Sequence, residues 1–245
     1  MLQNNRARTV EDIVRKLEQV QSRISLAARQ AGRNPQDIRL VVVTKTHPIQ
    51  DIEILLDEGI NCLGESYVEE ALPKISALAT RSGIEWHMIG HVQSRKARQV
   101  CENFHTLHSL DNLKLAKHLD RFAAETGRTL PVLLECNVSG EESKFGWPAW
   151  DESQWRALLP QIGEVLALTH LKVTGLMTIA PLTDDPERAR PYFQRLGKLR
   201  TYFSNLLPQV NWLELSMGMS ADFEIAIQEG ATLVRIGQAI LGPRL

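Results

Sequence analysis

The sequence predicts an α/β fold in which eight parallel strands close into a single (β/α)8 barrel, and three observations support this prediction. Eight short apolar runs alternate with segments of helical periodicity. Several of these segments end on a glycine just before the next apolar run, as helices often do at their C-terminal caps. No change of composition or Pro/Gly-rich linker divides the 245 residues. We therefore expect one domain, 1–245, with a doubly wound parallel sheet as the alternative fold.

The first element is an extra amphipathic helix that precedes the barrel repeat. Thr9 is a plausible N-cap, Glu11 and Asp12 fall in the first turn, and apolar residues recur at helical spacing as far as Gln30. Gly32 then ends the helix. The segment 1–32 is expected to pack on the outside of the barrel.

Strands and helices alternate through the rest of the chain. The expected strands are the apolar runs 40–45, 61–65, 86–90, 106–109, 131–138, 173–179, 212–216 and 233–236. The expected helices are the amphipathic segments 49–58, 68–79, 94–102, 111–126, 150–168, 186–207 and 221–229.

Composition excludes several classes of function. The 28 Lys and Arg residues nearly balance 29 Asp and Glu residues, so no overall field attracts nucleic acid or anionic lipid. Three cysteines without a C-x-x-C pair, Cys62, Cys101 and Cys136, predict neither disulfides nor a zinc site. No apolar run has transmembrane length and no secretory h-region follows Met1. We expect a cytoplasmic protein in a reducing compartment, without membrane or nucleic-acid partners.

A lysine ends the first expected strand. In Val41-Val-Val-Thr-Lys45, alternation places Val41, Val43 and Lys45 on one face. Parallel α/β folds carry their chemistry at the carboxyl ends of such strands, which makes Lys45 a candidate covalent amine. The alternative is that Lys45 only marks the strand end and extends its amine to water.

The most specific signal in the C-terminal third is Ser216-Met-Gly-Met-Ser-Ala-Asp222, a small turn between a strand and a helix. Its backbone N–H groups can face an anion. Arg235 and Gly237 follow in the last strand and the turn after it. Because the loops after strands seven and eight of such barrels commonly bind phosphate, the two turns predict a phosphate site. Alternatively, Gly218 and Gly237 only permit tight turns.

Closure of the barrel places the first strand beside the last two. Lys45 and the phosphate site would then hold one ligand that carries both an aldehyde and a phosphate, a description that pyridoxal 5′-phosphate meets. Burial among valines disfavours the ammonium form of Lys45 and so favours the neutral, reactive amine.

Five sequence blocks are spread over nearly the whole chain: Val41-Val-Val-Thr-Lys45-Thr46, Trp86-His-Met-Ile-Gly-His-Val-Gln-Ser-Arg-Lys96, Gly175-Leu-Met-Thr-Ile-Ala-Pro181, Leu215-Ser-Met-Gly-Met-Ser220 and Val234-Arg-Ile-Gly237. Together they resemble the signatures of the pyridoxal phosphate homeostasis protein family, which has the barrel of the alanine racemase N-terminal domain.

The resemblance implies a set of cofactor-binding residues. Lys45 would carry the cofactor as an internal aldimine, and Arg235 would lie against the pyridine nitrogen. A guanidinium donates but does not leave that nitrogen protonated, so the ring would be a poor electron sink. The residues expected around the rest of the cofactor are Ser66, Met177, Ser216, Gly218, Met219, Ser220 and Gly237.

One residue departs from the family pattern. Where the family usually reads Gly-Glu-Asn after the second strand, this chain has Gly64-Glu65-Ser66. A hydroxyl is shorter than the amide that would reach the cofactor ring. We therefore expect weaker retention of the cofactor than an asparagine would give.

Two histidines four residues apart, His87 and His91, are weak candidates for a metal site. Strand geometry separates them, and no acidic partner is evident at matching spacing. We expect a packing role for His87, a loop role for His91 and no metal. The basic cluster Ser94-Arg-Lys-Ala-Arg98 is expected to be a solvated face.

Three functions remain. The first is a non-catalytic carrier that stores or delivers pyridoxal phosphate, affects amino-acid and keto-acid pools and contacts apoenzymes transiently. The second is an amino-acid racemase, which needs a second base; Tyr67, Tyr192 and Tyr202 all fall in helical segments, and the chain ends at Leu245 just after the eighth strand. The third is a sugar-phosphate enzyme with Lys45 as its Schiff-base lysine. The sequence favours the carrier, as a monomer.

Overall fold

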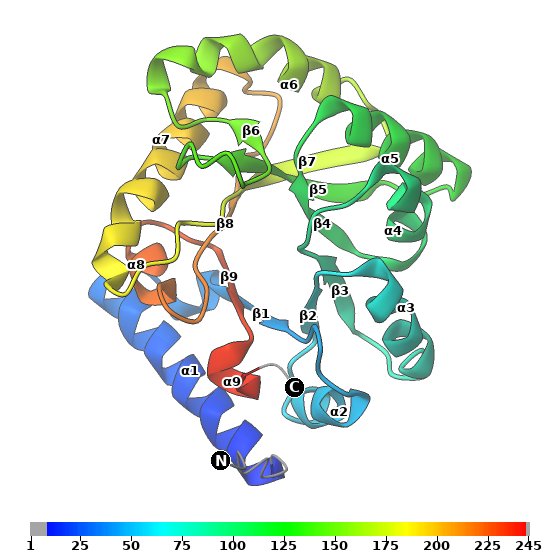
Figure 1. Ribbon diagram of the computed structural model, residues 1–245, viewed down its shortest axis with the longest axis vertical. Helices are drawn as coiled ribbons and strands as arrows, with labels where there is room; N and C mark the ends of the chain where they lie inside the picture. The colour runs from blue at the N-terminus through cyan, green and yellow to red at the C-terminus, as the bar shows by residue number, and fades with distance from the viewer. Residues whose placement is uncertain (1–8, 244–245) are drawn as a thin grey trace.

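The computed structural model describes residues 9–243, in which eight parallel strands close into a barrel (Figure 1). Their order around the barrel is β1-β2-β3-β4-β5-β7-β8-β9, and β9 pairs with β1. The (β/α)8 prediction is thus confirmed, and closure excludes an open doubly wound sheet. The strands are β1 Arg39–Val43, β2 Cys62–Glu65, β3 Glu85–Met88, β4 Thr106–Leu110, β5 Leu130–Asn137, β7 Leu171–Met177, β8 Glu214–Ser216 and β9 Leu233–Ile236.

Helices surround the strands on the outside of the barrel (Figure 1). They are α1 Val10–Gln30, α2 Ile49–Asp57, α3 Val68–Ala77, α4 Ala97–Asn103, α5 Leu113–Glu125, α6 Leu159–Leu166, α7 Arg190–Leu206, α8 Phe223–Gln228 and α9 Gln238–Leu241. Three of the expected helices begin with 3-10 turns, at Ser94–Lys96, Glu152–Leu158 and Pro186–Ala189. The two-residue strand β6, Trp147–Pro148, and the short helix α9 have no counterpart among the predicted elements.

Helix α1, at the start of the described chain, packs against helices near its end. Its N-terminus is capped by the Thr9 hydroxyl, which accepts from the Asp12 N–H at 3.2 Å. Its buried stripe packs near α8 and α9 (Figure 1), and Arg23 forms an ion pair with Glu224 and lies 4.6 Å over the ring of Phe223. Residues 1–8 of the predicted N-terminal segment lie outside the described residues.

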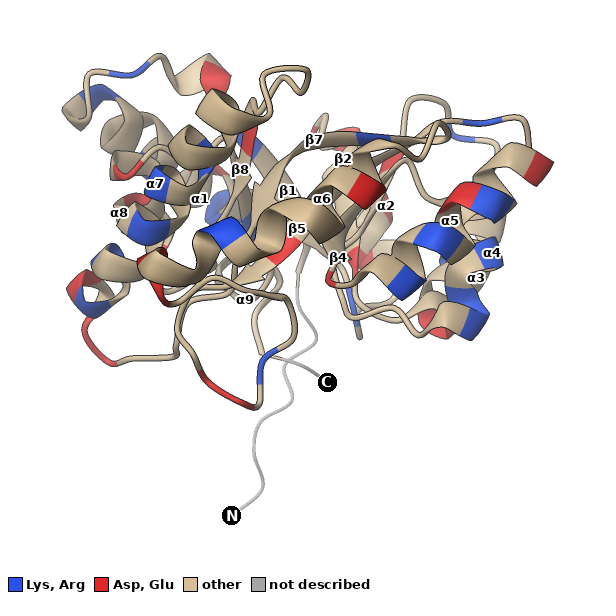
Figure 2. Cartoon of the chain, turned by 90° about the horizontal axis from the view of Figure 1, so that it is seen from above, with Lys and Arg blue, Asp and Glu red and all other residues tan. Residues whose placement is uncertain are grey.

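The outer surfaces of the helices carry both signs of charge. Figure 2 shows Lys and Arg interspersed with Asp and Glu on α3, α4 and α5. Pairs such as Arg98 with Glu125 and Lys117 with Glu164 join neighbouring helices there. This distribution fits the absence of an overall field. No helix within residues 9–243 is long and apolar enough to cross a membrane.

The barrel interior is divided between apolar and polar side chains. Val41, Leu133, Met177 and Leu233 form a small apolar cluster there, separate from the main core between strands and helices. Polar side chains fill much of the remaining interior, and the almost completely buried ones include His87, His108, Glu135, Ser216 and Arg235. An interior of this kind differs from the stacked apolar layers usual in such barrels.

Strand β1 ends two residues before Lys45, and this corrects the expectation that the strand runs to residue 45. Pairing with β9 ends at Val42 and pairing with β2 ends at Val43. Beyond that point the strand pairing stops, with one last backbone hydrogen bond from the Thr44 N–H to the Gly64 carbonyl of β2 at 3.0 Å. Lys45 therefore lies in the turn that follows the strand.

Candidate functional site

A cavity of about 1020 Å³ opens at the carboxyl ends of the strands. Residues that follow β1, β2, β3, β8 and β9 line it, so segments distant in sequence meet at one place. Six of the predicted cofactor residues are among the lining: Lys45, Ser66, Met219, Ser220, Arg235 and Gly237. The other three, Met177, Ser216 and Gly218, are not among the residues that line it.

The backbone before Lys45 is held by a buried ion pair. Lys74, on α3, donates to the Thr44 carbonyl and to Glu65 Oε1, both at 2.8 Å. The Thr44 hydroxyl donates to the same carboxylate oxygen at 2.7 Å. Burial raises the pKa of Glu65, and the hydrogen bond from Lys74 opposes that shift. The other oxygen, Oε2, has no hydrogen-bond partner among the described residues.

The backbone after Lys45 is held by the same lysine through a second carboxylate. Thr46 has a φ of 63°, which a β-branched residue rarely adopts. Its N–H donates to Glu70, which also accepts from Lys74 Nζ at 2.6 Å. A strained residue persists where its surroundings hold it in place. Lys74 thus anchors the peptide groups on both sides of Lys45.

The turn after β8 is shaped by a glycine. Gly218 has a φ of +93°, and a Cβ at this position would lie 2.6 Å from the Ala226 Cβ and 2.9 Å from the Phe223 Cα. Only glycine fits there without a shift of the backbone. The next residue, Met219, donates its N–H to Asp222 Oδ1 at 2.6 Å, which fixes the turn.

The turn after β9 lies against the first one. The Ser220 hydroxyl accepts from the Ala239 N–H at 3.2 Å. A Cβ on Gly237 would lie 2.9 Å from the Val43 carbonyl oxygen, so the two chain segments approach closely. No hydrogen bond within residues 9–243 is donated by the backbone N–H of Ser220 or of Gly237. These donors can therefore serve an anion in the cavity.

Arg235 is a buried cation at the cavity. Its Nη1 donates to the Ser216 hydroxyl at 2.6 Å and its Nη2 donates to the Thr178 carbonyl at 2.9 Å. Burial lowers its pKa to about 10, and the charge of Glu135 opposes the shift, so it remains charged at neutral pH. The buried Ser216 hydroxyl therefore orients the Arg235 guanidinium and does not line the cavity itself.

Glu135 is a lining residue that the sequence analysis missed. Burial raises the pKa of its carboxyl to about 7; Asp111 adds to the shift and Arg235 opposes it. The signal in the sequence was an acidic residue near the end of an otherwise apolar strand, Leu133-Leu134-Glu135. This carboxyl can gain or lose a proton near neutral pH beside Arg235.

His91 is paired with an acid, and the expectation that it lacks such a partner is wrong. Its Nδ1 lies 2.9 Å from Asp111 Oδ2, and its ring stacks on Phe145 with centroids 3.7 Å apart. Asp111 follows β4, twenty residues away, so local spacing could not reveal it. Burial raises the pKa of Asp111, and His91 opposes the shift.

Tyr67 also lines the cavity, which corrects its expected place in a helical segment. It precedes α3 as the N-cap residue in extended conformation, with φ −129° and ψ 121°. Tyr67 therefore lies at the cavity, one residue before the helix begins. Its side chain is largely exposed.

A line of buried hydrogen bonds runs from Arg235 through the barrel. Ser216 Oγ lies 2.8 Å from His108 Nδ1, and His108 Nε2 lies 2.8 Å from His87 Nδ1. Burial lowers the pKa of both histidines, that of His87 to about 4, so both rings are neutral at neutral pH. The packing role expected of His87 thus includes a hydrogen bond.

Comparison with known proteins gives a consistent relationship. The family model "Alanine racemase, N-terminal domain" matches residues 16–244. A pyridoxal phosphate homeostasis protein from Synechocystis sp. (strain PCC 6803) is 44% identical over 86% of this chain and 94% of its own length.

Solved structures agree with this relationship. The structure of PipY from Synechococcus elongatus PCC7942 with PLP bound has a TM-score of 0.80 and 33% identity, covering 94% of this chain and all of PipY. Alanine racemase from Clostridium difficile 630 has a TM-score of 0.68 and 16% identity, covering 94% of this chain and 56% of the racemase. At that identity the racemase shares the fold alone.

Proposed function

The chain belongs to the pyridoxal phosphate homeostasis protein family, and from this premise we propose that it binds pyridoxal 5′-phosphate in the cavity at Lys45. In this role it stores or delivers the cofactor within vitamin B6 homeostasis and thereby influences amino-acid and keto-acid metabolism. It turns over no substrate of its own.

One observation carries this proposal: a lysine amine and a pair of turns with open backbone donors line the same cavity. The cofactor, when bound, supplies an aldehyde carbon that a primary amine attacks reversibly. Lys45 is the amine in this cavity that two flanking peptide anchors hold in place. The N–H groups of Ser220 and Gly237 are the donors for the phosphate. The residues present therefore fit the cofactor.

The remaining residues of the predicted set support the site in different ways. Arg235 would be the donor for the pyridine nitrogen, and the Ser216 hydroxyl orients it by accepting a hydrogen bond from Nη1. Gly218 allows the first turn to pack on α8. Met219 lines the cavity, while Met177 packs in the apolar cluster inside the barrel.

Arg235 supports the proposed absence of transamination-type turnover. A guanidinium is always charged and has no acceptor, so it does not transfer a proton to the pyridine nitrogen. Without that proton, the bound cofactor would supply only weak electron withdrawal at this site. The protein is further inferred to act as a cytoplasmic monomer that meets apoenzymes transiently, which sedimentation of the holoprotein alone and with an apoenzyme would test.

The amino-acid racemase remains the second candidate because of His91. Racemisation needs an acid–base group on each face of the cofactor. His91 and its partner Asp111 place a second such group in the cavity, and Tyr67 lines it as well. Sustained racemisation of alanine or serine by the wild-type chain, lost in His91→Gln, would establish this function and overturn the carrier.

The carrier is tested by cofactor transfer. The holoprotein is mixed with a pyridoxal phosphate-dependent apoenzyme, and the gain of enzyme activity is compared with the rate at which free cofactor leaves the carrier. We expect transfer at least as fast as spontaneous release. Borohydride reduction followed by peptide mapping should fix the cofactor on Lys45, and Lys45→Ala should remain colourless after desalting. Lys117→Ala, at an exposed position of α5, is the matched control. Reduction at another lysine would refute the proposed site.

A further inference from the structure

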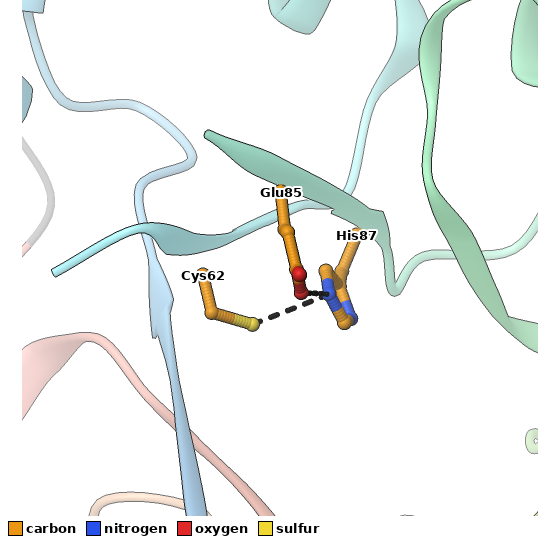
Figure 3. A group of neighbouring side chains, drawn as sticks. All are labelled: Cys62, Glu85 and His87. Carbon is orange, nitrogen blue, oxygen red and sulfur yellow. Dashed lines mark hydrogen bonds and ion pairs between the residues drawn. The ribbon is translucent and has the colours of Figure 1, made fainter. Parts of the chain in front are cut away.

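A group of three metal-ligating side chains lies at the opposite end of the barrel, which we call the amino mouth: the first residues of the strands, among them Arg39, Cys62, Glu85 and Glu214. Figure 3 shows Cys62 from β2 and Glu85 and His87 from β3 pointing toward one another. Their ligand atoms all lie within 4.8 Å of one another. No step of the proposed cofactor binding uses them.

We propose that Cys62, Glu85 and His87 bind a divalent metal ion of the zinc class, with water as the fourth ligand. A sulfur, a nitrogen and an oxygen donor form a set that zinc accepts. Three protein ligands leave one tetrahedral position open.

The distances fit such an ion. His87 Nε2 lies 3.2 Å from Cys62 Sγ and 3.5 Å from Glu85 Oε2. Zinc bonds of about 2.3 Å to sulfur and about 2.0 Å to nitrogen and oxygen imply tetrahedral edges of about 3.3 to 3.6 Å. The two distances from His87 match these edges, and the separation of Cys62 from Glu85, within 4.8 Å, can close to such an edge by rotation of the half-exposed Glu85 side chain. A thiol–imidazole hydrogen bond alone would explain the first distance but not the approach of Glu85 to the same nitrogen.

The histidine is already oriented as metal-bound histidines are. Such a residue almost always donates its other ring N–H to a neighbouring group. Nδ1 of His87 lies 2.8 Å from His108 Nε2, so the ring is fixed with Nε2 toward Cys62 and Glu85. A neutral imidazole is the form of histidine that binds metals.

The net charge of the three side chains and their access to solvent also favour binding of a metal ion. With a neutral thiol, the group carries the single negative charge of Glu85, since Arg39 and Glu214 compensate each other at 2.8 Å. Metal binding with loss of the thiol proton makes the group neutral. The thiolate is the form of cysteine that ligates a metal, so binding releases the thiol proton. The Glu85 side chain is 52% exposed and gives an ion a route from solvent.

Cobalt(II) titration of the full chain, stripped of metal with a chelator, tests the proposal. We expect one equivalent of Co²⁺ to produce a thiolate-to-cobalt charge-transfer band and the visible bands of a tetrahedral site, both removed by Zn²⁺. Affinity should rise about tenfold for each pH unit, because one proton leaves on binding. Wild-type protein without a thiolate–cobalt band would overturn the proposal.

Variants make the assignment specific. Cys62→Ser should abolish the charge-transfer band, and Glu85→Gln, at a partly exposed side chain, should weaken binding by at least about tenfold. Cys101→Ser is the matched control and should retain the band, because the Cys101 thiol is buried away from the proposed site and donates to the Leu119 carbonyl at 3.3 Å. Circular dichroism of each variant reports folding.

Lys45→Ala should bind the ion as the wild type does, which separates this site from the cofactor site. A band that survives Cys62→Ser would refute the assignment.

Discussion

The two mouths of the barrel are built from the same strands but hold their charged groups differently. At the carboxyl mouth, the end of the barrel where the cavity with Lys45 opens, four charged residues are almost completely buried: Glu65, Lys74, Glu135 and Arg235. At the amino mouth, by contrast, Arg39 is 48% exposed and Glu214 is 22% exposed. Water screens the second pair and not the first group. Burial at the carboxyl mouth fixes the site, and each charge there depends on its partners for stability.

The largest effect is expected when the buried network under Lys45 loses its cation. Lys74→Met leaves Glu65 buried without its partner, which should lower the free energy of unfolding by about 3 to 5 kcal/mol. Urea unfolding measures this loss. Lys117→Met removes one member of the exposed pair with Glu164 and should cost less than about 1 kcal/mol. Adding Glu65→Gln to Lys74→Met should restore part of the loss; equal costs for the two lysines would contradict the contrast between buried and screened charge.

A pH-dependent effect is expected at Glu135. Its folded-state pKa of about 7 lies above its ordinary value of 4.5, so the folded protein binds this proton more tightly than the unfolded chain. The wild type should therefore lose stability as pH rises from about 4.5 to 7, by a total on the order of 3 kcal/mol. Glu135→Gln lacks this loss, and its stability relative to wild type should rise through that window and level off above it.

Urea unfolding at several pH values measures the difference for Glu135→Gln. Glu164→Gln, at an exposed site, is the control and should track the wild type. A difference for Glu135→Gln that stays constant from pH 5 to pH 8 would show that this carboxyl titrates normally.

A comparison of two glycines distinguishes the cost of backbone strain from the cost of steric crowding. Gly218 and Gly59 both have positive φ, but a Cβ at Gly59 meets nothing within 4 Å, whereas at Gly218 it meets Ala226 and Phe223. Gly218→Ala should therefore destabilise by about 1 to 3 kcal/mol more than Gly59→Ala and should also weaken cofactor binding. Thermal unfolding and cofactor titration check both parts. Equal effects would mean that the turn after β8 has room to relax.

A smaller effect is expected at Ser66, which lines the cavity. Ser66→Asn restores the longer amide of the family pattern, and one added hydrogen bond is worth about 1 kcal/mol. Cofactor release, followed by absorbance after dilution, should slow about fivefold. Ser204→Asn on the outside of α7 is the control. Identical release rates would show that residue 66 does not contact the cofactor.

The smallest effect is expected at the amino mouth. Arg39→Met removes a partly exposed ion pair and should change the free energy of unfolding by less than about 1 kcal/mol. Cofactor affinity should be unchanged. A large loss of affinity on titration would show that the two mouths are not independent.

The sequence predicted the barrel well because its signals are local. Apolar runs, helical periodicity and terminal glycines such as Gly59 and Gly230 mark strands and helices within a few residues. The two-residue strand β6 and the four-residue helix α9 are too short to show a period. The position of Lys45 beyond β1 depends on where the neighbouring strands end, which one strand does not reveal.

From the sequence alone, site residues could be predicted only where they belong to a short local motif. The turns at Ser220 and Gly237 and the lysine at the end of an apolar run could be found in this way. Lys74 could not, because a lysine on an amphipathic helix normally faces water, and its partner Glu65 lies on a strand. The pair of His91 with Asp111 likewise forms only when β3 and β4 come together.

The pairing of β1 with β9 has a consequence for how the protein is made. Residues 39–42 align with residues 233–236, so the barrel closes across almost the entire chain. During synthesis the segment that carries Lys45 leaves the ribosome long before the turn at Gly237 exists. Contacts this distant in sequence form late, because a long loop must close first. At the proposed site, cofactor capture would therefore follow the last strand into place, and we predict that nascent chains that stop before β9 do not retain pyridoxal phosphate.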